Sequence, residues 1–170
     1  MPAVGFRPSR VRVRGAGACA TWLSNRVLGL GPEGYGRILH KGLLAREKMA
    51  AALRSVPDIL LAEPSDLNLV GFCLAKPGES LSEVNRRTSG LVAHFESCPG
   101  FSVSRTSLGL VSHGRLLRAL AKERGIRLNE DDWVLIRLVL MNPFLVSREM
   151  SVDIIAEFVL ELRAAAAKVG

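Results

Sequence analysis

The chain has 170 residues, of which 48% are apolar and only 5% are aromatic. This length fits one ordinary domain with a core built mainly from aliphatic side chains. The formal net charge of +7 favours anionic partners such as nucleic acid, acidic membranes, phosphate cofactors or carboxylate substrates. The sequence shows no signal-peptide pattern and no run of 18 apolar residues, so it predicts neither secretion nor a membrane span.

The positive charge is concentrated near the start of the chain. Five arginines precede the first acidic residue, Glu33: Arg7, Arg10, Arg12, Arg14 and Arg26. No aromatic residues alternate with them, as they would in a single-strand binder, so nucleic acid is not expected as a partner. Residues 1–14 are left as an unassigned basic segment.

The cysteine count excludes two common kinds of small domain. Cys19, Cys73 and Cys98 are odd in number and far apart, and this spacing forms neither a disulfide framework nor a zinc site. We expect free thiols, in a cytoplasmic protein.

Hydrophobic periodicity predicts a mixture of helices and strands. Five helices are predicted, at 16–28, 34–54, 81–97, 112–124 and about 147–166. Four strands are predicted, at 58–62, 67–75, 101–106 and 133–141. Ser80 and Glu83 form a capping box before the third helix, and Gly125 ends the fourth. We therefore predict an α/β fold with a small, mostly antiparallel sheet backed by helices.

The last predicted strand carries one charge, Arg137, in the middle of an apolar run. Apolar residues occupy both alternating faces, which is the pattern of a strand covered on both sides. An arginine buried there would need an anion close by. On the residues alone, that anion is either an internal carboxylate in a structural ion pair or part of a ligand.

Several motifs resemble sites but lack the context that the chemistry requires. The G-x-G-x-x-G pattern at 29–34 follows a helix rather than a strand, so we interpret it as a turn. His40 and Lys41 resemble the pair that anchors pyridoxal phosphate, but they lie within a predicted helix. His94 has no metal-binding companion. The remaining candidates, Ser102, Ser104 and His113, form no catalytic triad signature.

Several segments in order resemble one enzyme family. They are Trp22, Leu-Gly-Leu-Gly-Pro-Glu-Gly-Tyr-Gly-Arg at 28–37, Leu-Asn-Leu-Val-Gly-Phe at 67–72, Val-Asn-Arg-Arg at 84–87, Phe-Ser-Val-Ser-Arg-Thr at 101–106, Ile-Arg-Leu-Val-Leu-Met-Asn-Pro at 136–143, and Asp153. Together, over about residues 15–165, they resemble the C-terminal portion of the group II pyridoxal-phosphate-dependent amino-acid decarboxylases. That family includes enzymes acting on glutamate, aspartate, diaminobutyrate and aromatic amino acids.

The resemblance implies the C-terminal small domain of the type I pyridoxal-phosphate-dependent transferase fold at 57–170. Residues 15–56 would be helices that lead from the cofactor domain. The Arg of the family's R-x-x-x-x-N-P strand binds a substrate carboxylate, which here implies a substrate-binding role for Arg137. The family's cofactor lysine, stacking histidine and pyridine-binding aspartate lie upstream of the matching region and have no counterpart here. Where the family often has Cys-Phe-Arg, this chain has Gly-Phe-Cys at 71–73.

Two hypotheses of function follow. The chain is a fragment of a decarboxylase acting on an acidic amino acid such as glutamate or aspartate, inactive alone because its cofactor, pyridoxal 5'-phosphate, has no anchoring lysine. Alternatively, it is a non-catalytic module that pairs with a full-length decarboxylase. The expected partners are the amino-acid substrate, a lysine-bearing decarboxylase domain or homologue, and a second subunit of a homodimer. A basic anion binder unrelated to decarboxylation is a third, more distant reading.

Overall fold

The structure is a computed structural model that describes residues 16–65 and 67–169. The chain divides into two compact units, residues 1–37 and 38–170. In the first unit, α1 (Ala16–Leu28) has no buried residue and Trp22 is 62% exposed. Gly29 ends this helix with a φ of 74°, and a single π-helical turn, η1 (Pro32–Gly36), follows it.

The glycine-rich segment between α1 and α2 is a turn, as predicted. Gly34 lies so close to the carbonyl oxygens of Leu28 and Gly29 that a Cβ atom would collide with both. Only glycine fits a backbone approach of this kind. The glycines therefore serve the chain's own packing, and the segment does not follow a strand as a dinucleotide-binding loop would.

The second unit is built on a four-stranded antiparallel sheet with strand order β1-β2-β4-β3. The strands are β1 (Ile59–Leu61), β2 (Leu69–Leu74), β3 (Ser104–Gly109) and β4 (Asp132–Val139). The helices are α2 (Arg37–Arg54), α3 (Leu81–Ser97), α4 (Leu110–Arg124) and α5 (Ile154–Lys168). The α/β class and the antiparallel sheet are thus confirmed. Within the described residues, none of the helices combines the length and apolarity needed to span a bilayer.

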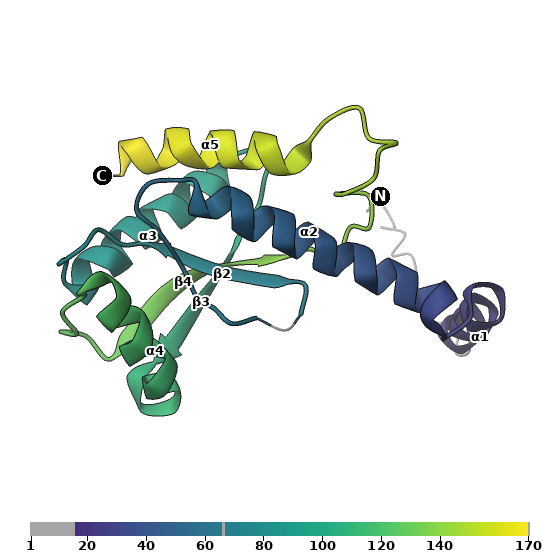
Figure 1. Cartoon of the computed structure of the whole chain (residues 1–170), viewed down its shortest axis with the longest axis horizontal. Coiled ribbons are helices and arrows are strands. Elements are labelled where there is room, and N and C mark those ends of the chain that lie inside the picture. Colours follow the sequence, from purple (N-terminus) through teal and green to yellow (C-terminus); the bar gives the residue numbers. More distant parts are fainter. Residues whose placement is uncertain (1–15, 66, 170) are drawn as a thin grey trace, which may run out of the picture. The chain divides into compact units, whose positions relative to one another are not determined.

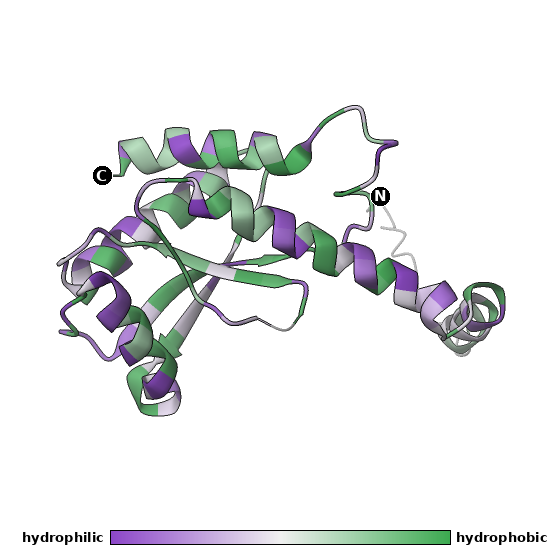
Figure 2. Ribbon diagram, in the orientation of Figure 1, coloured by the Kyte–Doolittle hydropathy of each residue, from purple (hydrophilic) through white to green (hydrophobic). Residues whose placement is uncertain are grey.

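The sheet has a hydrophobic core on each face. Figure 1 shows α2 and α5 on one side of it and α4 on the other, and the hydropathy colours of Figure 2 mark β2 as mainly apolar. On the first face, Phe72, Ile136 and Leu138 pack with residues of α2, α3 and α5. On the second face, Trp133 and Leu135 pack with residues of α4 and the first turn of α3.

Helix α3 contributes to both cores because it lies where β2 and β4 separate. The pairing of these strands ends at Phe72 and Ile136. Beyond that pair, the N–H of Leu74 donates to the Thr88 hydroxyl at 3.1 Å, and the N–H of Val134 donates to the Asn85 amide oxygen at 2.8 Å. Two side chains of α3 therefore replace the backbone acceptors that a neighbouring strand would have supplied.

The caps of α3 and α5 determine where these helices begin. The predicted capping box is present, and the hydroxyl and N–H of Ser80 both donate to Glu83, which holds the pKa of this carboxyl below its usual value. Helix α5 begins seven residues later than the predicted Ser147. Its N-cap is Asp153, whose pKa is lowered by a hydrogen bond from Lys48 and by the N–H of Ala156. The predicted helix would bury Met150 on its apolar stripe, but this residue lies before α5 and is 38% exposed.

Two further predictions need correction. Strand β3 begins at Ser104 rather than at 101, and the segment before it contributes Phe101 and Val103 to the core without strand pairing. The apolar spacing at 34–54 predicts a buried stripe of Tyr35, Ile38, Leu39, Leu43, Ala50 and Leu53, but of these only Ala50 and Leu53 are buried. Near its start, Leu39 is 68% exposed.

Replacing Thr88 with Val should test how much the hydrogen bond from the Leu74 N–H to the Thr88 hydroxyl stabilises the domain. The valine keeps the shape but leaves the buried N–H of Leu74 without an acceptor, which costs about 1–3 kcal/mol. Urea unfolding should show that loss. The neighbouring substitution Ser89→Ala is the control and should change the free energy of unfolding by less than about 0.5 kcal/mol. Equal stabilities of the two variants would contradict the role given to Thr88.

Candidate functional site

Arg137 lies in the middle of β4 between two neighbouring strands. Its backbone pairs with Gly71 of β2 on one side and with Ser104 of β3 on the other. The side chain is exposed and makes no hydrogen bond or ion pair with any residue that the structure describes. The guanidinium is therefore held on a rigid strand and is available to a ligand or partner.

The prediction that this strand is covered on both sides is wrong at Arg137. Helix α4 packs over Trp133 and Leu135, which are 0% and 4% exposed. The next residues on the same face, Arg137 and Val139, lie beyond this cover, and Val139 is 41% exposed. Because water reaches the guanidinium, the argument that a buried cation must have an internal anion does not apply to this residue.

Apolar and small residues surround Arg137 on this uncovered part of the sheet. We call this surface the open sheet face; besides Arg137 it comprises Leu67, Leu69, Gly71, Val139 and Met141. Leu67 and Met141 are 62% and 73% exposed. Gly71 places no side chain beside Arg137. Exposed aliphatic side chains next to one unpaired charge are typical of a surface that meets a partner or ligand.

The chemistry available at this surface is anion recognition. A guanidinium presents a planar fork of N–H donors that matches a carboxylate or phosphate in a two-bond arrangement. Arg137 is positioned for such binding by strand pairing on both sides, which fixes the backbone from which the side chain extends. The arrangement can orient an anionic group but supplies no acid, base or nucleophile of its own.

A cavity of about 280 Å³ borders β4 near the same residue. Its walls come from α2, α5 and the segment before β3, including Met49, Phe101 and Phe158. Arg137 is the one titratable residue that borders it, and its side chain extends from the opposite face of the sheet. The cavity is therefore an apolar hollow and not a catalytic centre.

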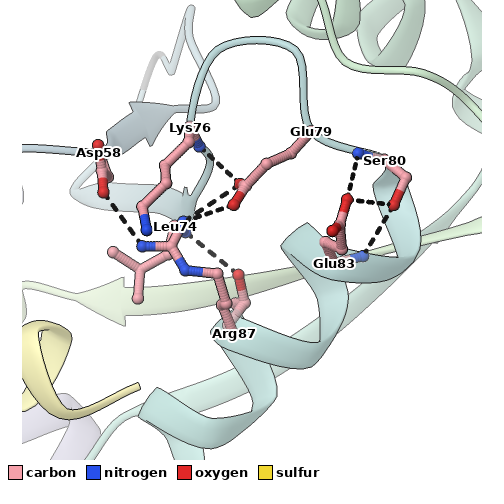
Figure 3. A network of polar contacts seen from close by, with 8 residues as sticks. Asp58, Leu74, Lys76, Glu79, Ser80, Glu83 and Arg87 are labelled. Carbon is pink, nitrogen blue, oxygen red and sulfur yellow. Dashed lines mark hydrogen bonds and ion pairs between the residues drawn. The ribbon is translucent and has the colours of Figure 1, made fainter. Parts of the chain in front are cut away.

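The cation that is buried is Arg87 of α3, which sequence analysis did not single out. Its side chain is 3% exposed and forms ion pairs of 3.1 Å with both Asp58 and Glu79. Figure 3 shows these two carboxylates approaching the guanidinium from different segments, one before β1 and one before α3. Among the described residues, the Nε atom of Arg87 has no hydrogen-bond partner. Arg87 therefore forms the kind of internal structural ion pair that the sequence had offered as one explanation of Arg137.

The backbone at Asp58 reflects its role in this network. Pro57 and Asp58 occupy the centre of a turn closed by a 3.4 Å hydrogen bond from the Ile59 N–H to the Val56 carbonyl. Asp58 has a φ of 63°, in a position where turns of this type prefer glycine or asparagine. A carboxylate at this position reaches Arg87, which glycine could not do.

A signal for Arg87 does exist in the sequence. It stands three residues after Val84 and four before Leu91, on the buried stripe of α3. A charge on such a stripe calls for opposite charges nearby, but the partners Asp58 and Glu79 are 29 and 8 residues away. Sequence spacing alone therefore does not identify them.

The other residues considered from sequence do not assemble a site. His40 and Lys41 are exposed on α2. His94 contacts Glu161 of α5 at 2.7 Å, so this histidine joins two helices. Among the residues that the structure describes, no hydrogen bond joins Ser102 or Ser104 to His113, and no group of three or more His, Cys, Asp and Glu is placed to hold a metal ion.

The residues of this chain do not fit pyridoxal phosphate. Lys41 is exposed on a helix and does not line the cavity beside β4. A lysine that forms a Schiff base with a cofactor lies instead in a pocket that shields the bond and tunes its pKa.

The three cysteines are free thiols in different surroundings. Cys19 is exposed and Cys98 is half-buried, whereas Cys73 is fully buried on β2. Burial raises the pKa of the Cys73 thiol from 9.0 to about 12, and the neighbouring Trp133 and Arg124 offset only part of this effect. Cys73 is a core residue and not a nucleophile.

Comparison with known proteins adds no identification. No family model matches the sequence, and no curated protein matches it.

Replacing Arg87 with Met should destabilise the domain strongly. The substitution leaves Asp58 and Glu79 without their cation, and breaking a buried pair in this way costs roughly 3–5 kcal/mol. Arg86→Met is a matched control, because Arg86 is the exposed neighbour on the same helix. We expect this control to change the free energy of unfolding, measured in urea, by less than about 0.5 kcal/mol. Similar losses in both variants would contradict the assignment.

Thiol labelling should separate Cys73 from the other two cysteines. At pH 8 a disulfide reagent should label Cys19 readily and Cys98 more slowly, and Cys73 only after unfolding in urea, as peptide mapping would show. The raised pKa has a consequence for stability. The protonated Cys73 thiol contributes stability that is fully present below pH 9.0, the pKa of the thiol in the unfolded chain. This contribution is lost as the pH rises toward about 12, the pKa in the folded chain. Rapid native labelling of Cys73 would contradict its burial.

Proposed function

We propose that this chain supplies the small, carboxylate-recognising domain of a group II pyridoxal-phosphate-dependent amino-acid decarboxylase. The observation that carries the proposal is the exposed guanidinium of Arg137, which has no partner among residues 16–65 and 67–169 and extends from a strand held on both sides. It coincides with the residue to which the resemblance assigns substrate binding. The four-stranded antiparallel sheet with helices is compatible with a small domain of this kind.

The open sheet face supports a contact with a second domain. Val139, Leu67 and Met141 expose aliphatic surface beside Arg137, and covering such surface is favourable. A domain placed there would also remove water from around the guanidinium. Because charge-assisted hydrogen bonds strengthen in a drier environment, Arg137 would then bind a carboxylate more tightly than in the isolated chain.

The proposed substrate is an acidic amino acid such as glutamate or aspartate. Arg137 would pair with one carboxylate of the substrate and so fix its orientation. Pyridoxal phosphate, which acts as the electron sink in this enzyme family, would be held by a lysine-bearing cofactor domain, because the lysines of this chain do not fit it. A cytoplasmic location and a homodimeric enzyme are parts of the same proposal.

A non-catalytic module that pairs with a full-length decarboxylase would use the same surface. The open sheet face is equally suited to a contact with a cofactor domain of the same enzyme and to a contact with a separate full-length decarboxylase. Borohydride reduction in the presence of pyridoxal phosphate, followed by mass spectrometry, shows whether a lysine of this chain binds the cofactor covalently, as it would in an enzyme that needs no second polypeptide. We expect no specific pyridoxyl-lysine on the chain alone, and a stoichiometric label would contradict the proposal.

Replacing Arg137 with Ala should abolish substrate recognition without unfolding the domain. We would combine the chain with a lysine-bearing cofactor domain of a glutamate decarboxylase and measure CO2 release from glutamate and aspartate. Losing one partner of a desolvated charge pair should lower kcat/KM by about 100-fold or more. Arg137→Lys should recover part of the loss, because lysine keeps the charge but not the planar fork.

The control is Arg115→Ala, which removes an exposed arginine of α4. It should leave kcat/KM and the thermal midpoint unchanged. Circular dichroism should show that Arg137→Ala keeps the native fold. Unfolding of this variant would assign Arg137 a structural role, and an unchanged kcat/KM would remove it from substrate binding.

A further inference from the structure

The outer edge of the sheet at β3 has unused backbone donors and acceptors. The N–H of Leu110 donates to the Asp131 carbonyl at 2.7 Å, in register with the β3–β4 pairing. In an antiparallel pair the direction of these bonds alternates along the strand. The backbone groups of Ser104, Thr106 and Leu108 therefore point toward β4. Those of Arg105 and Ser107, and the N–H of Gly109, point away from it, and among the described residues no backbone bond from outside the helices and strands reaches them. The Gly109 carbonyl is the N-cap acceptor of α4 and would have to accept a second bond.

Apart from the exposed charge of Arg105, this edge lacks the usual protection against pairing. β3 is six residues long, whereas β1 at the opposite edge has three. It contains no proline, and its register with β4 runs without a bulge from Ser104 to Gly109. An unprotected edge of this length is a template for another strand.

The side chains beside the edge carry charges of opposite sign at its two ends. A polar cleft of about 360 Å³ lies between α3 and this part of the sheet, and its walls include Arg86, Arg105, Glu130 and Asp132. Arg105 lies toward the start of β3, and Asp132 lies opposite Gly109 at its end. None of these four side chains forms an ion pair in the described part of the chain.

Gly109 leaves the acidic end accessible from the edge. A Cβ atom at this position would lie 3.2 Å from the Asp132 carboxylate oxygen. The carboxylate therefore lies beside the glycine, and no side chain of β3 separates it from a strand added outside. An arginine on such a strand, opposite Gly109, could reach Asp132.

We propose that β3 pairs antiparallel with β3 of a second copy of this chain, around a two-fold axis at Ser107. In this register Ser107 lies opposite its own equivalent, and Arg105 lies opposite Gly109 of the second copy. The three outward-facing residues of each strand then form the hydrogen-bonded pairs of the new ladder. Each Arg105 extends over a glycine to Asp132 of the other copy, so the symmetric interface has two ion pairs.

The charge distribution favours a second copy as the occupant of the edge. Antiparallel pairing brings the basic end of one strand to the acidic end of the other, so the same surface is complementary to itself, as a two-fold interface requires. The decarboxylase hypothesis also expects a homodimer but assigns it no contacts. The β3 interface does not rest on that hypothesis, because Arg137 and the open sheet face take no part in it.

Charge reversal across the two-fold axis tests the pairing. Sedimentation equilibrium of the full chain should detect a dimer. Arg105→Glu or Asp132→Arg alone should raise the dissociation constant of the dimer by at least about tenfold, because either substitution puts two like charges next to each other at both ion-pair positions. The double variant R105E/D132R restores opposite charges and should recover the dimer. Arg115→Glu on α4 is the control of equal charge change and should leave dimerisation unaffected.

A second variant tests the backbone ladder directly. Ser107→Pro removes an N–H that points outward, so the fold should survive, as circular dichroism would show, while the dimer is lost. A wild-type chain that is monomeric at all concentrations would overturn the proposal. So would a dimer that persists in both single charge variants and in Ser107→Pro, or a double variant that stays monomeric.

Discussion

The buried ion pairs of Arg87 join the parts of the chain on which the α/β unit depends. Asp58 precedes β1, Glu79 precedes α3, and Arg87 lies on α3 itself, so one guanidinium connects the start of the sheet to the helix that completes it. Next to Arg87, Thr88 accepts the N–H of Leu74 at the point where β2 leaves β4. Because a cation with 3% exposure cannot rely on water, its carboxylates restrict how α3 can be placed. The position of α3 in turn determines how the two strands diverge.

The placement of α3 also explains why the sheet is covered unevenly. The first turn of α3 joins α4 over Trp133 and Leu135, whereas the later turns join α2 and α5 on the other face. The two helices that cover the second face therefore lie at one end of β4, and at the other end Arg137 and Val139 are exposed among the described residues of this unit. The same strand thus carries both a core and an exposed guanidinium, which is why it can present a charged side chain from a rigid support.

Local patterns were sufficient to predict most elements, because their causes lie within a few residues. The capping box of Ser80 and Glu83 and the left-handed Gly125 at the end of α4 are both local, and both are present. The environments of the arginines were not predictable, because they depend on residues far away. Alternation of apolar residues indicates that a strand is apolar, but not how far a helix extends over it. The start of α5 was misplaced for a similar reason, since Asp153 becomes the cap through contacts that include Lys48, 105 residues away.

Arg87 and Arg137 show why the chemical type of a residue does not decide its role. Both arginines follow apolar patterns in the sequence, but one meets two carboxylates and the other meets none among the described residues. A guanidinium already paired twice contributes to the fold and has little capacity left for a ligand. An exposed guanidinium adds nothing comparable to stability, because water already solvates it. Its value lies in what approaches it, so the surface around it determines its function. At Arg137 that surface is aliphatic, and a partner that covered it would bury the charge together with whatever anion it binds.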